Sequence, residues 1–487
     1  MLRRPAYLVL VTLAALAATA GTAAARHGLR TGFTDHEAFQ SLSADQTRTA
    51  FAHAKAAGSS FVRLTSSWSS VEVAKPPNAD AANDPSWSGY RWGSVDRAVR
   101  QATAAGLRVL LSWNAAPVWA EGPGRPSLRE APAGSWRPSA TAYRRFAHAV
   151  ARRYSGGYPD PLGGRLPRVR YYQAWNEPNL SNFLTPQWAR RRGRYVAVSP
   201  VLYRRLLNAF YAGVKSVHRS NYVVSAGTAP FAEPRKGARR MPAAYFTREF
   251  LCVRGRRHPR PFRCSNSPAR FDALAHHPYP IGPPRRPAIN VDDVVVPDIW
   301  KLTRPLRVAI RAGKVAPRRR KPVWATEISW DTRPPDPDGL SLDQQARYLE
   351  GALYTLWRQG VDVVTWYLMR DEARGRGYAY TLQSGIYFRG ATVAADRPKP
   401  SFQSFRFPFT AYRRRGVAQL WGLAPRQGRV AIEVQRGGRW RHLLSLRARR
   451  ADRLFFRGRR IRKGSLLRAR QGAATSLAWR VAENITE

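Results

Sequence analysis

Acidic residues are scarce in this sequence. Only 31 of its 487 residues are Asp or Glu, against 82 Lys or Arg, so the formal net charge is +51. Nine of the basic residues are lysines, and such a preference for arginine, with abundant Ala and Pro, is typical of a GC-rich coding bias. The charge therefore requires no dedicated polyanionic partner, although a surface this positive is expected to bind nucleic acid or an anionic cell envelope nonspecifically.

Long apolar runs are also few. Residues 7–20 form such a run, which follows two arginines and precedes an Ala-x-Ala sequence of the kind that signal peptidase accepts. We expect residues 1–25 to be a signal peptide, with Arg26 at the mature N-terminus and the protein outside the cytoplasm. An uncleaved N-terminal anchor is the alternative. No later run approaches the length of a transmembrane helix, so we expect no stable membrane span in the mature chain.

Cysteine is limited to Cys252 and Cys264. Two thiols alone do not make a zinc site, and in an exported protein they are expected to close one surface loop as a disulfide. The Gly-rich phosphate loops of nucleotide-binding proteins are absent as well. We therefore expect no metal and no cofactor. Hydrophobic residues make up 44% of the chain, which is enough for a substantial core and excludes wholesale disorder.

Short apolar runs alternate with longer amphipathic runs from residue 28 to about residue 400. Helices are predicted where apolar residues recur every three or four positions, at 43–57, 94–105, 141–154, 203–217 and 341–357. Strands are predicted at 29–34, 60–65, 107–113, 169–175, 222–227, 271–276, 322–327 and 361–368. Eight predicted strands with helical patterns between them predict an α/β fold, a (β/α)8 barrel over residues 26–408. An open doubly wound sheet is the structural alternative.

The composition changes near Phe409. Residues 410–487 contain 20 basic and 4 acidic side chains, and short alternating runs are separated by Gly-rich turns. Strands are predicted at 417–421, 429–436, 440–446 and 477–481. We expect residues 409–487 to form a small antiparallel β-sandwich. Trp421, Trp440 and Trp479 either bind sugar or form its core, and in so small a domain the core is the more common place for tryptophan.

Two predicted strands end in carboxylates. The fourth runs into Trp175-Asn176-Glu177-Pro178, and the seventh ends at Glu327. Barrel enzymes carry their catalytic groups at this C-terminal rim, and two carboxylates are what cleavage of a glycosidic bond requires. Alternatively, Glu177 caps a helix start and Glu327 forms an ion pair in this arginine-rich chain.

These motifs resemble those of clan A glycoside hydrolases, and within the clan those of the family 5 and family 39 groups, including cellulase-like proteins. The resemblance covers residues 28 to about 405. It implies that Glu177 is the general acid/base, Glu327 the nucleophile, and Asn176 a ligand of the sugar 2-hydroxyl. It also implies substrate-site roles for Arg63, His277, Tyr279 and Trp366, the last as an apolar platform for a sugar ring.

The sequence therefore predicts an exported, monomeric enzyme that hydrolyses β-glycosidic bonds of an oligo- or polysaccharide with retention, through a covalent intermediate. Arg63 and the Tyr279 hydroxyl are expected to favour the ionised form of Glu327. His276 and His277 are not expected to bind a metal together, because neighbouring residues of a strand point to opposite faces. The rival hypotheses are an inactive barrel that binds carbohydrate or belongs to the envelope, and a basic polyanion-binding protein.

Overall fold

Residues 28–482 are described by the structure, a computed structural model, and the expected signal peptide lies outside these residues. Eight parallel strands form one sheet, and each pairs with its neighbour along the order β11-β13-β16-β1-β2-β3-β4-β7. Isolated parallel bridges at Val224–Ala273 and Thr228–His276 join β7 to β11 and close the ring. The strands are β1 (Arg30–Thr34), β2 (Phe61–Ser67), β3 (Arg108–Asn114), β4 (Tyr171–Ala174), β7 (Tyr222–Ser225), β11 (Leu274–His276), β13 (Val323–Ala325) and β16 (Val361–Tyr367). The predicted (β/α)8 barrel is confirmed.

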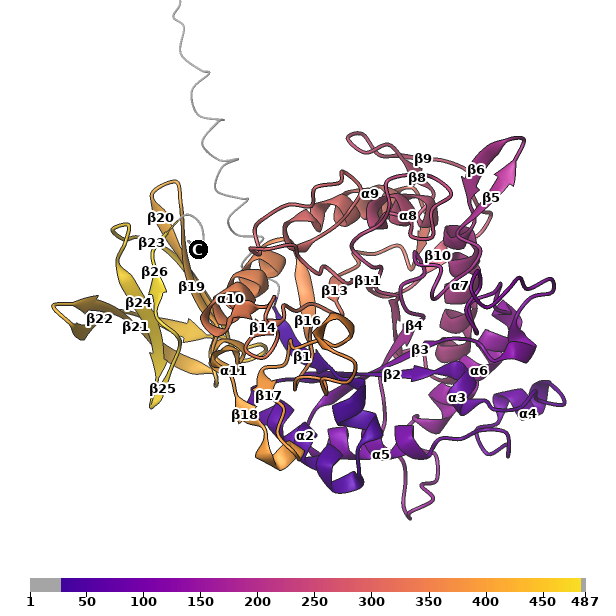
Figure 1. Cartoon of the computed structure of the whole chain (residues 1–487), viewed down its shortest axis with the longest axis horizontal. Coiled ribbons are helices and arrows are strands. Elements are labelled where there is room, and N and C mark those ends of the chain that lie inside the picture. Colours follow the sequence, from indigo (N-terminus) through magenta and orange to yellow (C-terminus); the bar gives the residue numbers. More distant parts are fainter. Residues whose placement is uncertain (1–27, 483–487) are drawn as a thin grey trace, which may run out of the picture.

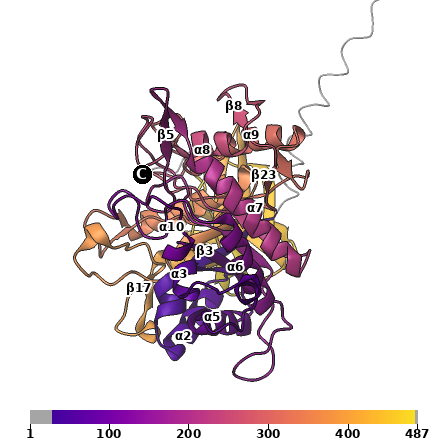
Figure 2. The same cartoon turned by 90° about the vertical axis from the view of Figure 1, so that its right-hand side faces the viewer.

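Helices surround the ring of strands (Figures 1 and 2). Several begin where a serine side chain accepts a backbone N–H of the first turn, as Ser43, Ser139 and Ser341 do. The larger helices are α2 (Ala44–Ala56), α5 (Gly93–Ala104), α6 (Ala140–Arg153), α7 (Ser199–Val217), α8 (Ala243–Phe250), α9 (Trp300–Arg311) and α10 (Leu342–Arg358). The amphipathic pattern predicted five of them, whereas α8, which is short, and α9, which contains Pro305, were not predicted.

Shorter elements fill the connections. They are α3 (Trp68–Val71), α4 (Ala79–Asn83), α11 (Pro400–Arg406), the hairpin of β5 (Trp188–Arg191) and β6 (Arg194–Ala197), the hairpin of β8 (Val253–Arg254) and β9 (Arg260–Pro261), and the two-residue pairs β10 (Ala269–Arg270) with β12 (Val315–Ala316), β14 (Thr332–Arg333) with β15 (Leu340–Ser341), and β17 (Tyr387–Phe388) with β18 (Arg397–Pro398). The expected disulfide between Cys252 and Cys264 is present, with a Cα–Cα distance of 5.4 Å. Among residues 28–482, no helix is both long and apolar enough to cross a lipid bilayer.

The barrel interior is apolar at one end and polar at the other. Phe61, Tyr171, Tyr222 and Trp324 pack ring against ring inside the strands, with centroids 5.1–5.7 Å apart. These residues lie near the N-terminal ends of their strands, so they close that end of the barrel. The hydrogen-bonding side chains, described below, lie toward the C-terminal ends.

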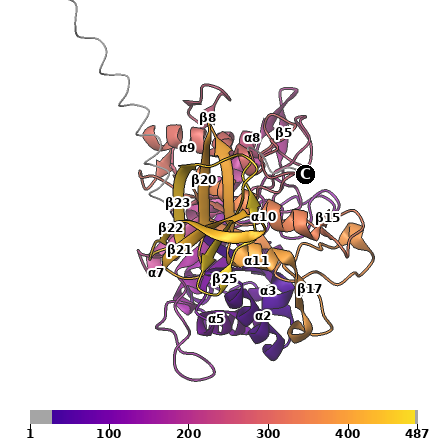
Figure 3. The ribbon, with the colours of Figure 1, turned by 90° about the vertical axis from the view of Figure 1, so that its left-hand side faces the viewer.

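Two antiparallel sheets follow the barrel (Figures 1 and 3). The first contains β19 (Phe409–Arg414), β20 (Val417–Leu423) and β23 (Leu454–Arg460). The second contains β21 (Gly428–Arg436), β22 (Arg439–Ala448), β24 (Leu466–Gln471), β25 (Ala474–Thr475) and β26 (Trp479–Arg480). The C-terminal antiparallel β fold is thus confirmed, and four of its strands were predicted. Residue 409, where β19 begins, remains our predicted domain boundary.

Aromatic side chains join the C-terminal sheets to the barrel. Trp357 of α10 packs against Trp421 and Phe456, and Tyr354, one turn earlier, stacks on Tyr412. Trp421 is fully buried, and Trp479 is nearly so, at 3% exposure. These two tryptophans therefore belong to the core, and neither offers an open face to a sugar.

Candidate active site

Glu177 and Glu327 meet at the C-terminal rim of the barrel. Glu177 lies three residues after β4, and Glu327 two residues after β13. Because the C-terminal ends of parallel strands share one edge of the sheet, residues separated by 150 positions converge here. One carboxylate oxygen of each lies within 4.8 Å of the other. The side chains are 15% and 14% exposed, so both carboxylates remain open to a ligand.

The backbone after β4 is bent to present Glu177. Trp175 and Glu177 have φ angles of +74° and +37°, a left-handed conformation that is costly for residues other than glycine. The Trp175 N–H donates to the Trp113 carbonyl, and the Glu177 N–H donates to the Gly227 carbonyl. These bonds to the neighbouring strand regions hold the bend. Local strain of this kind concentrates at functional sites.

Arg63 of β2 is the centre of the hydrogen-bond network. It is 1% exposed, and its Nη1 donates to Glu327 Oε1. Its Nη2 donates to Asn176 Oδ1 at 2.9 Å, and its Nε donates to Gln173 Oε1 at 2.6 Å. The guanidinium therefore fixes Glu327 and Asn176 relative to each other. The Asn176 amide group remains available to donate a hydrogen bond.

His277 lies between the two carboxylates. Its Nδ1 is 2.7 Å from Glu177 Oε1, and its Nε2 is 3.7 Å from Glu327 Oε1. The ring occupies space that a side chain at position 227 would fill, because a Cβ on Gly227 would lie 2.1 Å from His277 Nε2. The neighbouring His276 contacts Thr228 and the Val294 carbonyl instead, and burial lowers its pKa to about 3. His276 is therefore a neutral packing residue.

Tyr279 completes the surroundings of Glu327, because its hydroxyl donates to Glu327 Oε2 at 2.9 Å. Burial alone would raise the pKa of Glu327, but the charges of His277 and Arg63 and the Tyr279 hydrogen bond lower it overall. Glu327 is thus held as a carboxylate. The expectation that Arg63 and Tyr279 contact this residue agrees with the geometry.

Trp366 is the one predicted site residue that does not join this cluster. It is 1% exposed, its indole N–H donates to the Ser384 carbonyl, and its ring lies against Trp330. Its neighbour Tyr367 is less buried and packs edge to face with Tyr279, with centroids 6.5 Å apart. Tyr367, rather than Trp366, therefore stands beside the carboxylates.

Two polar partners of Arg63 were not predicted from the sequence. Gln173 of β4 is fully buried, and its Nε2 also donates to the Ser225 carbonyl. Ser112 of β3 accepts from Arg63 Nη2 at 3.2 Å. Both are polar residues within otherwise apolar strands. That pattern could have indicated them, because a buried polar group on a strand needs a hydrogen-bond partner inside the barrel.

A divalent cation is the other ligand that this geometry suggests. Among residues 28–482, Glu177, His277 and Glu327 form the group of three whose donor atoms are close enough to share an ion. However, Arg63 already supplies a buried positive charge to Glu327, and His277 Nδ1 is engaged with Glu177. A metal ion here would be repelled by that guanidinium, so the donors are better explained as a carboxylate pair.

Comparisons with known proteins agree with this barrel. No family model and no curated protein matches the chain. A family 39 glycoside hydrolase from Bacteroides cellulosilyticus superimposes with a TM-score of 0.53 at 17% identity, over 89% of this chain and 79% of that one. A family 39 enzyme from Xanthomonas axonopodis pv. citri gives a TM-score of 0.47 at 13% identity, over 91% of this chain and 93% of that one. A GH5_18 protein from Bifidobacterium longum subsp. infantis gives a TM-score of 0.46 at 13% identity, over 78% of each chain. The chain therefore shares its fold with a solved family 39 glycoside hydrolase.

Proposed function

We propose that this protein is a retaining glycoside hydrolase that cleaves β-linked sugars. The observation that carries the proposal is the pair of rim carboxylates, Glu177 and Glu327, with oxygens within 4.8 Å of each other. Retaining glycosidases have carboxyl groups about 5–5.5 Å apart, whereas inverting enzymes need about 6.5–9.5 Å to admit a water molecule. The separation therefore favours double displacement.

In the first step, Glu327 is the nucleophile. Its lowered pKa keeps it ionised, so an oxygen can attack the anomeric carbon while the bond from that carbon to the leaving oxygen breaks. Glu177 gives its proton to the leaving oxygen. His277, bonded to Glu177 through Nδ1, holds the acid in place. The product of this step is a glycosyl ester of Glu327.

In the second step, Glu177 acts as the base. The negative charge on Glu327 has been consumed by the ester, and Glu177, now a carboxylate, takes a proton from an incoming water. The water attacks the anomeric carbon, and Glu327 leaves as a carboxylate again, stabilised by Arg63 and Tyr279. We assign the Asn176 amide N–H to the sugar 2-hydroxyl, since the Asn176 Oδ1 accepts from Arg63, and hydrogen bonds to this hydroxyl contribute to transition-state stabilisation.

The protein is proposed to act outside the cytoplasm, after removal of residues 1–25. The disulfide between Cys252 and Cys264 supports this, because disulfides persist in oxidising compartments. We propose that residues 409–487 serve as a structural domain, since Trp421 and Trp479 are packed in its core.

Chemical rescue tests the proposal. Glu327→Gly should lose more than a thousandfold in kcat on a 4-nitrophenyl β-glycoside, and azide should restore turnover by entering the vacated face to give an α-glycosyl azide. In the matched variant Glu177→Gly, azide attacks the glycosyl ester instead and gives a β-glycosyl azide. If Glu327→Gly retains activity, or if the two products have the same configuration, the assigned roles are wrong.

A further inference from the structure

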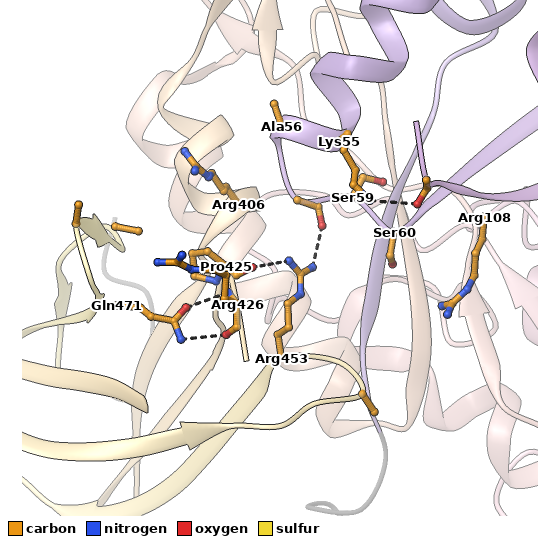
Figure 4. A pocket seen from close by; sticks show the side chains of 15 residues that line it. Lys55, Ala56, Ser59, Ser60, Arg108, Arg406, Pro425, Arg426, Arg453 and Gln471 are labelled. Carbon is orange, nitrogen blue, oxygen red and sulfur yellow. Dashed lines mark hydrogen bonds between the residues drawn. The ribbon is translucent and has the colours of Figure 1, made fainter. Parts of the chain in front are cut away.

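A basic cleft of about 820 Å³ lies between the barrel and the C-terminal domain (Figure 4). One wall comes from the N-terminal end of the barrel, where Lys55 lies in the last turn of α2, residues 58–60 precede β2 and Arg108 begins β3. The other wall carries Arg406 of α11 and Arg426, which follows β20. The two proposed catalytic carboxylates follow the C-terminal ends of β4 and β13, so the cleft lies at the opposite face of the barrel.

The cations of this cleft have no acidic partners. Lys55, Arg108, Arg406 and Arg426 are exposed, and within residues 28–482 none of the four forms a salt bridge. No Asp or Glu lines the cleft. Asp452, which is adjacent in sequence to the lining residue Arg453, is occupied by Arg449.

Some arginines elsewhere in the protein are paired with acids. Arg100 is paired with Asp160, Arg153 with Asp96, and Arg389 with Glu37. The excess of basic residues leaves many cations without an acid, and what distinguishes this cleft is that four of them line one concavity. Positive side chains on two walls of a concavity reinforce each other and raise the local concentration of anions.

Arg453 makes the cleft a fixed structure. Its Nη2 donates to the Gly58 carbonyl at 2.9 Å, and its Nη1 donates to the Pro425 carbonyl at 3.1 Å (Figure 4). The first bond reaches the barrel and the second stays within the C-terminal segment. This half-buried guanidinium thus links the two walls through hydrogen bonds to the backbone of each.

We infer that this cleft binds an anionic glycan, with acidic groups of the polymer seated between Lys55 and Arg108 on one wall and Arg406 and Arg426 on the other. The cleft has no aromatic side chain among its lining residues, so it offers no platform for stacking nucleic-acid bases. The four cations can each pair with a carboxylate of such a polymer. This inference does not depend on the proposed hydrolase activity, because it concerns the other end of the barrel.

Binding of polygalacturonate by the full-length mature protein tests the inference. Neutralising the cleft with Lys55→Gln, Arg108→Gln, Arg406→Gln and Arg426→Gln should weaken binding at least tenfold at 0.1 M NaCl. The slope of log K against log salt should become shallower by about 3, as expected when four cations no longer release counterions. The double variant Lys55→Gln with Arg426→Gln removes one cation per wall and should give a smaller loss in the same direction.

A charge-matched control separates the cleft from the net charge of the protein. Arg457, Arg459, Arg460 and Arg462 are exposed on and after β23, away from the cleft lining. Changing these four to Gln should leave binding within about twofold of wild type. The inference is overturned if both sets of substitutions weaken binding equally, or if neutral dextran binds as tightly as polygalacturonate. It is also overturned if poly(dT) binds more tightly than polygalacturonate and the cleft substitutions abolish poly(dT) binding.

Discussion

At the scale of single residues, the site depends on one missing side chain. Gly227 leaves the room that the His277 ring occupies, and its carbonyl receives the Glu177 N–H. Both carboxylates are therefore positioned through a residue that has no chemistry of its own. A methyl group at position 227 cannot coexist with the present position of the imidazole.

Gly227→Ala should reduce kcat by at least tenfold while the protein still folds, because the ring of His277 must leave Glu177. Overpacking should also lower the free energy of unfolding by about 1–3 kcal/mol. Steady-state kinetics and thermal unfolding measure the two effects. Gly93→Ala is the matched control, since nothing lies within 4 Å of a Cβ at that helix position. Equal activity in the two variants would show that His277 does not hold Glu177 for catalysis.

Tyr279→Phe removes one of the two hydrogen bonds to Glu327 and leaves the ring. The Tyr279 hydroxyl helps to hold the pKa of Glu327 down, so its loss should raise that pKa. The nucleophile must be ionised, and the acidic limb of the profile of kcat/KM against pH should therefore move to higher pH. We expect kcat to fall about 10- to 100-fold. Tyr380→Phe, at an exposed position, should leave the profile unchanged.

At the scale of elements, α10 carries a buried acid on the face that meets the C-terminal domain. Glu350 is fully buried, its Oε1 accepts the Phe409 N–H, and its Oε2 has no hydrogen-bond partner. Burial raises the pKa of this carboxyl well above its usual value. The folded protein therefore holds a proton that the unfolded chain releases above pH of about 4.3. This group destabilises the fold increasingly as pH rises from there toward its folded-state pKa.

Glu350→Gln should therefore be more stable than wild type at pH 8, and the difference should shrink as pH falls toward 4. Glutamine keeps an oxygen for the Phe409 N–H. Thermal unfolding at both pH values gives the measurement. Glu433→Gln should show the opposite sign, because burial is outweighed by Arg468 and Arg470, which lower the pKa of Glu433. The ionised Glu433 stabilises the fold at pH 8, and this effect is lost as pH falls. A Glu350→Gln variant that was less stable than wild type at pH 8 would contradict this account.

The strands of the barrel could be predicted because each is a short β-branched or apolar run that ends in polar residues. What sequence patterns did not supply was the face of the last strand. Thr365 bonds to Thr34 and the Thr326 carbonyl inside the barrel, and alternation then places Tyr367 inside and Trp366 outside. The resemblance named Trp366, whereas the period of two only places Trp366 and Tyr367 on opposite faces and does not say which face points inward. Two-residue strands such as β10 and β12 carry too little pattern to predict at all.

The convergence of Glu177, Glu327, Arg63, His277 and Tyr279 was predictable for a related reason. Four of these residues follow a barrel strand, and closure of the ring brings the strand ends together. Arg63 was expected at the end of its strand but is the third residue of β2, so its side chain reaches the same site from inside the barrel. The buried partners of Arg63 were harder to predict, because a polar residue within an apolar strand does not indicate which group it bonds to. The basic cleft between the two domains had no local signal, since its walls come from six separate segments.

At the scale of the whole molecule, the two domains share one aromatic core. Trp357 contacts Trp421 and Phe456, Tyr354 contacts Tyr412, and Arg347 donates to the Ala478 carbonyl. Domains move freely relative to each other when the interface between them is small and polar. This interface is instead aromatic and buried. The barrel and the C-terminal sheets are therefore expected to unfold together.

Trp357→Ala tests that coupling. The indole is fully buried between α10 and the C-terminal sheets, so its removal should lower the free energy of unfolding by about 3–5 kcal/mol. Loss of catalytic activity reports unfolding of the barrel, and loss of near-ultraviolet circular dichroism reports unfolding of both parts. Because the cavity lies in the shared core, both losses should shift to lower temperature together. Trp440→Ala, on the half-buried face of β22, should cost less and leave the activity midpoint in place. Two separated transitions in the wild-type protein, or a Trp357→Ala variant that loses the sheets while the barrel keeps its midpoint, would show that the domains fold independently.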